Sequence, residues 1–339
     1  ATGTASIPNT RDGVQISCVI DPVTGNVIGG AIPAERNVIS GNGINGIFIF
    51  PDIETTVEGT RIIGNYVGTD VTGTVALPNV SSGIAVSGTY PPASNIDIGG
   101  SAPGEGNLIS GNRYGISLQS ASAVSVQGNL IGTNATGSSA LPNGSGVVIA
   151  ESFGSITTDC TIGGTDPAAS NLISGNEKYG VYISTGPGNQ VLGNRIGTDA
   201  SGSSPLGNGL YGVAFVGGSG NAVGGTAAGA SNIIAHNGVA GVVVIEGATG
   251  DSIRGNAIFS NTGLGIELPE EGVNPNDAGD GDTGANLLQN FPVLASAATS
   301  GSEIVIEGNL NSTSGTAFAL DFYASEACDL SGHGKGSMY

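Results

Sequence analysis

The sequence predicts an all-β protein: a right-handed parallel β-helix of about nine turns, followed by a short, incomplete β-sandwich-like C-terminal unit. Three patterns predict it: an asparagine hexad that recurs eight times, a Gly-Val/Ile pair that recurs nine times, and a lack of apolar residues at helical spacing. A recurring period identifies a repeat architecture, in which each unit buries its apolar residues against its neighbours. We therefore expect one solenoid rather than the two or three globular domains that 339 residues suggest.

The hexad consists of Asn, any residue, Val or Ile, two variable residues, and then Asn or Asp. It occurs at Asn37–Asn42, Asn65–Asp70, Asn107–Asn112, Asn129–Asn134, Asn171–Asn176, Asn194–Asp199, Asn232–Asn237 and Asn256–Asn261. If the turns stack in register, the first Asn of each hexad forms a column, because its amide both donates and accepts hydrogen bonds. The last positions then form a second column, in which Asp70 and Asp199 are the substitutions.

The Gly-Val/Ile pair opens a short alternating run, which places residues such as Ile47 and Ile49 on one face of a strand. A third apolar segment, such as Ile28-Gly29, precedes each hexad, so every turn contains three short strands. Plain turns alternate with turns that carry an insert, for example Val71–Asn79. Pro and Gly mark these inserts as surface loops.

The repeat stops after Leu268, so the sequence predicts three segments. Residues 1–268 form the solenoid, residues 269–290 an acidic linker loop, and residues 291–339 a partial β-sandwich-like module. In the last segment, Glu303–Glu307 and Ala317–Tyr323 alternate as antiparallel strands do, but they are too few to close a sandwich. Either the module is cut off or another chain completes it. The chain also starts in mid-turn, so both ends are either cut points of a longer chain or assembly interfaces.

Composition narrows the list of partners. The net charge is −19 with only eight Lys and Arg, which argues against nucleic-acid binding. No apolar run is long enough for membrane insertion. The three cysteines are not spaced as metal ligands, and an odd count gives no disulfide framework. We expect Cys18 and Cys160 to be small buried residues and none of the three to be catalytic.

Several motifs resemble those of bacterial extracellular right-handed parallel β-helix repeat proteins with the pectate-lyase-like solenoid. They are the Ile-Gly-Gly repeats, the Asn-Phe-Pro-Val run at Asn290–Val293, and the tetrads at Val67–Asp70, Ile131–Asn134 and Ile196–Asp199. The segment 327–332 is similar to the short β module that follows the helix in such proteins. The resemblance implies a modular extracellular or cell-surface protein. It implies no particular activity, because this solenoid carries lyases, hydrolases, epimerases and adhesins.

The acidic stretch from Asn276 to Asn286 contains the candidate metal ligands Asp277, Asp280 and Asp282. A Ca²⁺ ion takes six to eight oxygen ligands, and glycine permits the sharp loop that gathers them. No Glu occupies the twelfth position, so the stretch is not an EF-hand. It is either a Ca²⁺ site or a solvated acidic linker.

No catalytic residue is predicted, because the Lys and Arg residues are scattered over loops and corners. Gly332-His333-Gly334 resembles a short motif of polygalacturonase-type hydrolases but lacks the aspartate pair that accompanies it. We expect a non-enzymatic structural or adhesive surface module, whose partners are a surface glycan or other copies of itself assembled end to end into fibres. The alternative is a polysaccharide lyase or glycoside hydrolase on the same solenoid. A cleft with converging carboxylates and a basic residue would favour the enzyme.

Overall fold

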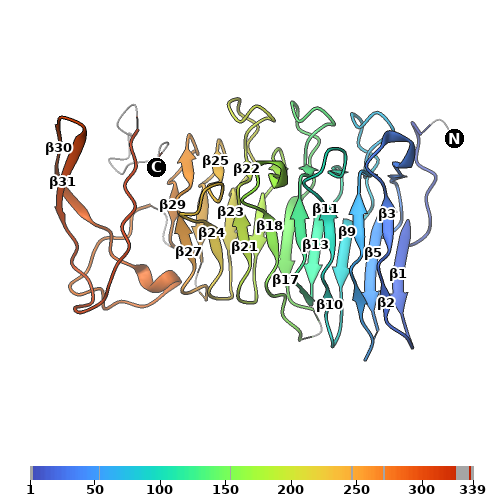
Figure 1. Ribbon diagram of the computed structural model, residues 1–339, viewed down its shortest axis with the longest axis horizontal. Coiled ribbons are helices and arrows are strands. Elements are labelled where there is room, and N and C mark those ends of the chain that lie inside the picture. Colours follow the sequence, from blue (N-terminus) through green and yellow to red (C-terminus); the bar gives the residue numbers. More distant parts are fainter. Residues whose placement is uncertain are drawn as a thin grey trace.

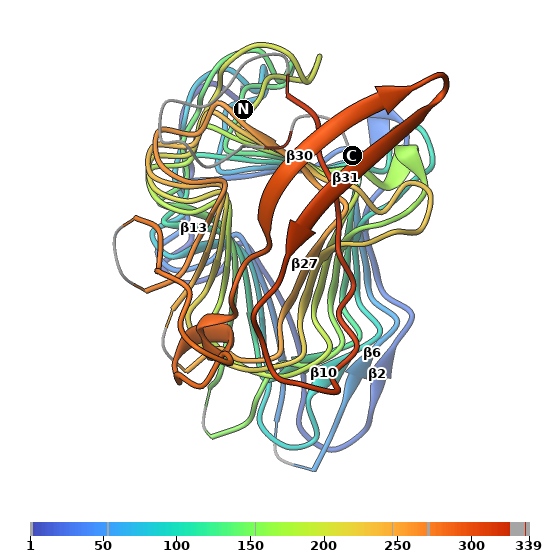
Figure 2. The ribbon, with the colours of Figure 1, turned by 90° about the vertical axis from the view of Figure 1, so that its left-hand side faces the viewer.

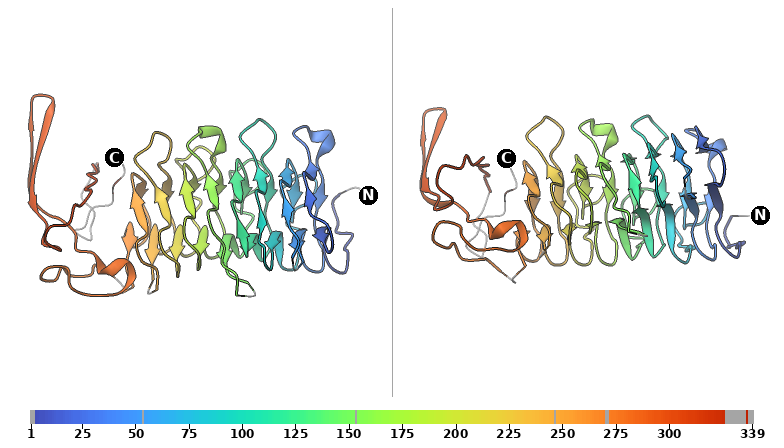
Figure 3. Two further views of the ribbon diagram at one scale, coloured as in Figure 1. Left: turned by 60° about the horizontal axis from the view of Figure 1, so that its bottom comes forward. Right: turned by 90° about the horizontal axis from the view of Figure 1, so that it is seen from below.

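The chain folds into a parallel β-solenoid with almost no helix, which confirms the all-β prediction. The computed structural model describes residues 3–52, 54–152, 154–245, 247–269, 272–325 and 336. In Figure 1 the solenoid lies horizontally, and strands of successive turns stand side by side. Figure 3 shows the same stack from two further directions, with a hairpin projecting at the C-terminal end.

Three parallel sheets run the length of the solenoid. The nine-stranded sheet contains β1 (Val14–Cys18), β5 (Ile47–Pro51), β9 (Ser82–Ser87), β13 (Tyr114–Gln119), β17 (Ser145–Ala150), β20 (Val181–Ile183), β23 (Val213–Phe215), β26 (Val242–Val244) and β29 (Ile266–Glu267). The first eight-stranded sheet contains β3 (Val27–Gly29), β7 (Arg61–Ile63), β11 (Asp97–Gly99), β15 (Ser125–Gln127), β18 (Thr161–Gly163), β21 (Gln190–Leu192), β24 (Ala222–Gly224) and β27 (Ser252–Arg254). The second contains β4 (Val38–Ile39), β8 (Tyr66–Val67), β12 (Leu108–Ile109), β16 (Leu130–Ile131), β19 (Leu172–Ile173), β22 (Arg195–Ile196), β25 (Ile233–Ala235) and β28 (Ala257–Phe259).

The remaining elements are short. A four-stranded sheet lies between the nine-stranded sheet and the first eight-stranded sheet in the early turns. It contains β2 (Val23–Thr24), β6 (Val57–Glu58), β10 (Ala93–Ser94) and β14 (Ala121–Ser122). Three 3₁₀ segments are described, η1 (Pro33–Glu35), η2 (Pro167–Ala169) and η3 (Ala285–Leu288). An antiparallel hairpin follows, β30 (Val293–Ser300) and β31 (Glu303–Asn309).

The prediction of about nine turns is too high. Each of eight levels carries a strand in all three long sheets, and the steps between these levels make about seven turns. β29 begins a further turn, which the described residues do not continue as strands of the other two sheets. Counting Gly-Val/Ile pairs overestimates the turns, because the last pair opens a turn whose other faces are not built as strands.

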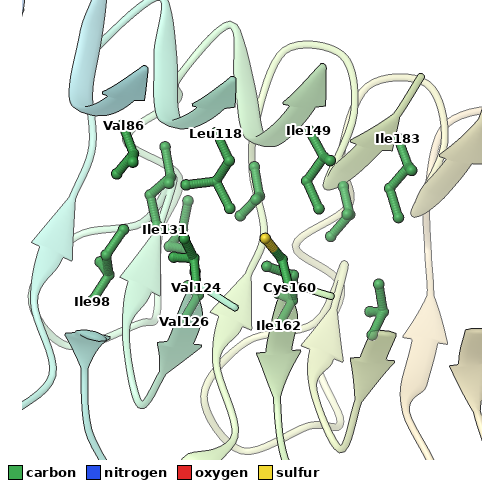
Figure 4. Packing of buried hydrophobic residues seen from close by; sticks show 14 of the residues in the cluster. Val86, Ile98, Leu118, Val124, Val126, Ile131, Ile149, Cys160, Ile162 and Ile183 are labelled. Atoms are coloured by element: carbon green, nitrogen blue, oxygen red, sulfur yellow. The ribbon is translucent and has the colours of Figure 1, made fainter. Parts of the chain in front are cut away.

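The core is a column of apolar residues inside the turns. Register pairs Val86 with Leu118 and Leu118 with Ile149, so equivalent residues stack directly. Figure 4 shows this column facing a second one, formed by Ile98, Val126 and Ile162. The residues of both columns are fully buried. Because each turn contributes only a few such residues, stacking on neighbouring turns is what removes them from water.

The glycine of the Gly-Val/Ile pair is required by close approach between turns. A Cβ atom on Gly46 would lie 2.6 Å from the carbonyl oxygen of Gly83 and 2.9 Å from Nδ2 of Asn79. Both atoms belong to the next turn. No larger residue fits this corner without moving the backbone, since real Cβ atoms do not approach so closely.

The first predicted asparagine column is confirmed. Nδ2 of Asn65 donates to Oδ1 of Asn107 at 3.1 Å, and Nδ2 of Asn107 donates to Oδ1 of Asn129 at 3.0 Å. The same bond joins each remaining pair of neighbours in the column, which are Asn37–Asn65, Asn129–Asn171, Asn171–Asn194, Asn194–Asn232 and Asn232–Asn256. Each donor thus finds an acceptor in the adjacent turn, so buried amides remain satisfied.

The second predicted column is wrong at three positions. Asp70, Asn134 and Asp199 do not stand in it, and the Asn at the end of each insert takes their place. The observed column is Asn9, Asn42, Asn79, Asn112, Asn143, Asn176, Asn208, Asn237 and Asn261. These three residues instead accept hydrogen bonds from the backbone of their own inserts. Hydrogen bonds from the Ser201 side chain and the Ser204 backbone lower the pKa of Asp199 to about 2.

A third column was not predicted. Nδ2 of Asn189 donates to Oδ1 of Asn221 at 3.1 Å, and Nδ2 of Asn221 donates to Oδ1 of Asp251 at 3.0 Å. The backbone N–H of Asp251 then donates to Oδ1 of Asn286 in η3. The other carboxylate oxygen of Asp251 is buried without a partner in the described part of the chain. Burial raises the pKa of Asp251.

The described C-terminal residues form one antiparallel hairpin and an irregular segment that returns to the solenoid. β30 and β31 are exposed along their lengths, and residues 317–323, predicted as a strand, form none. Instead Asp321 pairs with Arg254, and the carbonyl of Gly336 accepts from the Ile258 N–H at 2.8 Å. Figure 2 shows these C-terminal segments crossing the end of the solenoid. The alternating apolar residues of 317–323 do not form a strand, because the Arg254–Asp321 ion pair holds this segment against the last turn of the solenoid.

Two cysteines are buried free thiols, as predicted. Cys18 and Cys160 are both buried, and neither is in a disulfide. Burial raises the pKa of Cys160 to about 12, so its reactive thiolate is suppressed. Cys328 lies outside the described residues.

Candidate functional sites

The acidic loop brings the three predicted carboxylates together. Asp277, Asp280 and Asp282 each offer a carboxylate oxygen within 4.8 Å of the others. Their role as metal ligands stays a prediction. Desolvation, and then the negative charges of Asp277 and Asp280, raise the pKa of Asp282. Oδ1 of Asp282 is buried without a partner in the described part of the chain.

The acidic loop is ordered around Asn290, which is buried. Nδ2 of Asn290 donates to the carbonyl of Asp277 at 2.9 Å and to the carbonyl of Asn311 at 2.7 Å. Its backbone N–H donates to Oδ1 of Asp280 at 2.8 Å, and Ser312 donates to the other oxygen of Asp280. The first residue of the Asn-Phe-Pro-Val run thus organises the loop.

The outer face of the nine-stranded sheet holds a groove that the sequence analysis missed. Phe48 and Phe50 of β5 form one wall, with ring centroids 5.5 Å apart, and Tyr114 and Gln119 of β13 form the other. The floor is the outward side of β9, with Ser82, Ala85 and Ser87. The groove is open to solvent and has a volume of about 300 Å³, at the low end of the range for ligand sites.

The floor is buried although it faces outward. Ser82 and Ser87 of β9 are 3% and 9% exposed, and the neighbouring Ser117 of β13 is 4% exposed. In the part of the chain that the structure describes, no hydrogen bond joins these three hydroxyl groups to protein. The signal in the sequence is alternation itself: outward positions are aromatic in β5 and small in β9. This alternation predicts a groove only when β5 and β9 are known to be neighbours in the sheet.

A second aromatic cluster lies farther along the same sheet. Tyr179 contacts Tyr182 and Tyr211, with ring centroids 5.1 Å and 6.1 Å apart. All three are half-buried and precede or occupy outward positions of β20 and β23. The nine-stranded sheet thus carries two patches of aromatic residues separated by strands with smaller side chains.

One group of charges converges beside the first eight-stranded sheet: Arg61 of β7, Asp97 of β11 and Glu105 of the loop after β11. Nη2 of Arg61 lies 2.6 Å from Glu105, and Nε of Arg61 lies 3.9 Å from Asp97. Desolvation raises the pKa of Asp97, which Arg61 opposes and Glu105 reinforces. The motif Gly332-His333-Gly334 and the segment 327–332 lie outside the described residues.

Comparison with family models, with curated proteins and with solved structures gives no match. Within the described ranges, no helix has the length and apolar character needed to cross a bilayer. Because one fold hosts many functions, a proposed function has to rest on the sites described above.

Proposed function

We propose that the chain is a non-enzymatic structural and adhesive module of the extracellular space or cell surface, of the pectate-lyase-like solenoid kind. One observation carries the proposal: the outer face of the nine-stranded sheet presents aromatic side chains at Phe48–Phe50 and at the Tyr179 cluster. Aromatic residues are enriched where proteins bind partners, since each supplies a large and rigid contact area. The location rests on the resemblance of the tetrads and of Asn290–Val293 to bacterial extracellular repeat proteins.

A solenoid whose turns are joined by asparagine hydrogen bonds is rigid, and rigidity suits a module that presents a binding surface. Buried side-chain amides join every turn to the next, so the outward positions of neighbouring strands keep a fixed spacing of about 4.8 Å. A partner bound across several turns therefore meets a rigid array, and little entropy is lost on binding. The partner is a surface glycan or another copy of the chain.

Association between copies is part of the proposal. In the described ranges, β1, β2, β3 and β4 each pair on one side only, and strand pairing with a second copy at this edge is the contact we propose. At the other end, Asp321 and Gly336 contact the last turn. A strand of a second copy that pairs with the edge formed by β1–β4 would join two copies end to end. A contact of this kind gives an open filament when its rotation does not close. Sedimentation and electron microscopy test this part: concentration-dependent rods support it, and monomers at high concentration exclude it.

We also propose that the acidic loop binds Ca²⁺ through Asp277, Asp280 and Asp282. Three carboxylates in contact repel one another, and a divalent cation relieves that repulsion. The ion then stabilises the junction between solenoid and hairpin, since the loop is held by Asn290 and Asn311.

Binding and cleavage assays on polysaccharides test the adhesive function. The chain is expected to be retained on insoluble polysaccharides without releasing reducing ends or unsaturated products. If the chain neither binds any polysaccharide nor self-associates, both proposed partners are excluded and the adhesive function is wrong. Measurable cleavage would overturn it.

The second candidate function is a carbohydrate-active enzyme, which the Arg61, Asp97 and Glu105 group favours. A carboxyl with a raised pKa next to a second carboxylate is the arrangement that glycoside hydrolysis uses. If cleavage is found and Asp97→Asn and Glu105→Gln abolish it, the enzyme replaces the adhesive module. If cleavage survives both substitutions, this group is not its source.

A further inference from the structure

The groove over β9 combines features that identify a class of ligand. Its twelve lining residues include two Phe and one Tyr, several Ser, one Asn and one Gln, and no charged side chain. The protein has a net charge of −19, and none of that charge lies in the lining. A site without charge gives no preference to an ionic ligand.

The floor of the groove argues against a purely apolar ligand. Ser82, Ser87 and Ser117 line the groove and are mostly buried, but their hydroxyl oxygens are not among the buried side-chain atoms that lack a partner, so water reaches them. An apolar ligand would cover these hydroxyls and leave them without water or partner, which is unfavourable. A ligand with its own hydroxyl groups satisfies them. The aromatic walls in turn require an apolar surface on the same ligand.

The width of the groove fits one flat ring. β5 and β13 lie on either side of β9, so the two walls are about 9.6 Å apart at the backbone. A ring in van der Waals contact with both walls needs roughly 7–8 Å between wall atoms. The floor from Ser82 to Ser87 runs along the strand for about 16 Å, so the groove accommodates a chain rather than a single ring.

We propose that this groove binds a neutral glycan chain. The C–H faces of its sugar rings pack on Phe48 and Phe50, and its hydroxyls bond to Ser87 and, across β9 from these rings, to Ser117 and the Gln119 amide. The inference rests on the proposed adhesive function and names its site and ligand class. It assigns the adhesive contact to one place on the nine-stranded sheet.

Isothermal titration calorimetry with neutral hexasaccharides tests the site. The probes are β-1,4-linked glucose, α-1,4-linked glucose and β-1,4-linked mannose hexamers, with an α-1,4-linked galacturonic acid oligomer as the charged control. Binding of at least one neutral hexamer is expected, with no dependence on salt. Binding of the charged oligomer alone overturns the proposal.

Two variants and a matched control locate the binding. Phe50→Ala removes one wall and is expected to weaken binding at least tenfold, while Ser117→Ala weakens it about three- to tenfold. Gln15→Ala is the control, because Gln15 is exposed in β1 of the same sheet and does not line the groove, and Tyr182→Ala reports separately on the second aromatic cluster. Equal loss in Phe50→Ala and Gln15→Ala overturns the proposed site.

Filling the groove gives a test that does not depend on deleting a wall. Ala85→Phe fills the groove with a ring and is expected to abolish binding, and its melting temperature, measured alongside, shows whether the variant is folded. If Ala85→Phe binds normally, the groove is not the site. If the protein is retained on polysaccharide but only Tyr182→Ala releases it, the adhesive function stands and this inference fails. If no polysaccharide or hexamer binds, this inference fails too.

Discussion

Nδ2 of Asn42 donates a 2.8 Å hydrogen bond to Oδ1 of Asn79, and not to Asp70. The insert between Asp70 and Asn79 closes on itself, with the Asp70 N–H donating to the Val75 carbonyl and Thr69 bridged to Ala76. The chain therefore returns to the corner it had left, and Asn79 stacks on Asn42. The same geometry recurs at Asn143 and Asn208.

This arrangement predicts different stability effects for two asparagines of one turn. Asn143→Ala removes a fully buried amide and strands its partners Asn112 and Asn176, so it should lower the free energy of unfolding by about 1–3 kcal/mol. Asn134→Ala removes solvent-accessible bonds within the insert and should cost less than about 1 kcal/mol. Chemical denaturation of the two variants measures the difference. Equal losses would contradict the placement of Asn143 in the column.

Asp251 is the one acidic member of the third column, and Asp251→Asn should stabilise the protein. The new Nδ2 can donate to Oδ1 of Asn286, as Asn189 donates to Asn221, and no buried carboxylate oxygen is left unpaired. We expect a gain of about 1 kcal/mol at neutral pH in the free energy of unfolding. A variant no more stable than the wild type would contradict the unpaired carboxylate.

The gain should also depend on pH. Because the folded pKa of Asp251 is raised, the folded state holds this proton more tightly than the unfolded state does. The wild type therefore loses stability as pH rises from the unfolded pKa, about 3.9, through the folded pKa. Asp251→Asn should remove that loss, so the two melting curves should approach each other in acid. Melting temperatures from pH 3 to pH 7 test this.

Calcium binding can be tested at Asp282 without disturbing the loop. Asp277 and Asp280 hold backbone and side-chain hydrogen bonds, whereas Oδ1 of Asp282 has none among the described residues. Asp282→Asn should weaken Ca²⁺ binding at least tenfold in calorimetry and abolish the rise in melting temperature that Ca²⁺ gives the wild type. Asp21→Asn, at an exposed loop position, is the control.

The affinity for Ca²⁺ should increase with pH. The pKa of Asp282 is raised, so a proton competes with the cation in mild acid, and the competition ends as pH rises through that pKa. Titrations at pH 4 and pH 7 compare the two states. If neither Ca²⁺ nor EDTA changes the melting temperature of the wild type, the loop is not a calcium site.

The contact between Arg254 and Asp321 should hold the C-terminal segment on the last turn. Asp321→Asn removes a charge-assisted bond worth about 1.5–3 kcal/mol, and residues 311–325 should open more often. Hydrogen exchange should become faster there and at the Gly255 amide, which also donates to Asp321. The central turns should be unaffected, and Glu303→Gln on the exposed hairpin should change nothing. Unaltered exchange at Gly255 would show that the ion pair does not hold the segment.

Local patterns were sufficient to predict the solenoid and its first column. The hexads and the Gly-Val/Ile pairs repeat within single turns, and the alternation of Ile47 and Ile49 sets the inward face of a strand. These features depend on residues close together in sequence. The convergence of Asp277, Asp280 and Asp282 was also anticipated, because short spacing on a glycine-containing loop keeps side chains near one another.

Tertiary structure decided what depends on which turns are neighbours. Asn79 rather than Asp70 joins the column because backbone hydrogen bonds close the insert, and the hexad does not encode that closure. The groove needs Phe50, Ser87 and Gln119, which come from three separate turns. Asp321 returns to Arg254 across 67 residues. The sequence by itself determined the repeating unit, because stacking is built from local alternation. Register between turns, and thus every site that spans them, was fixed only when the backbone ladders formed.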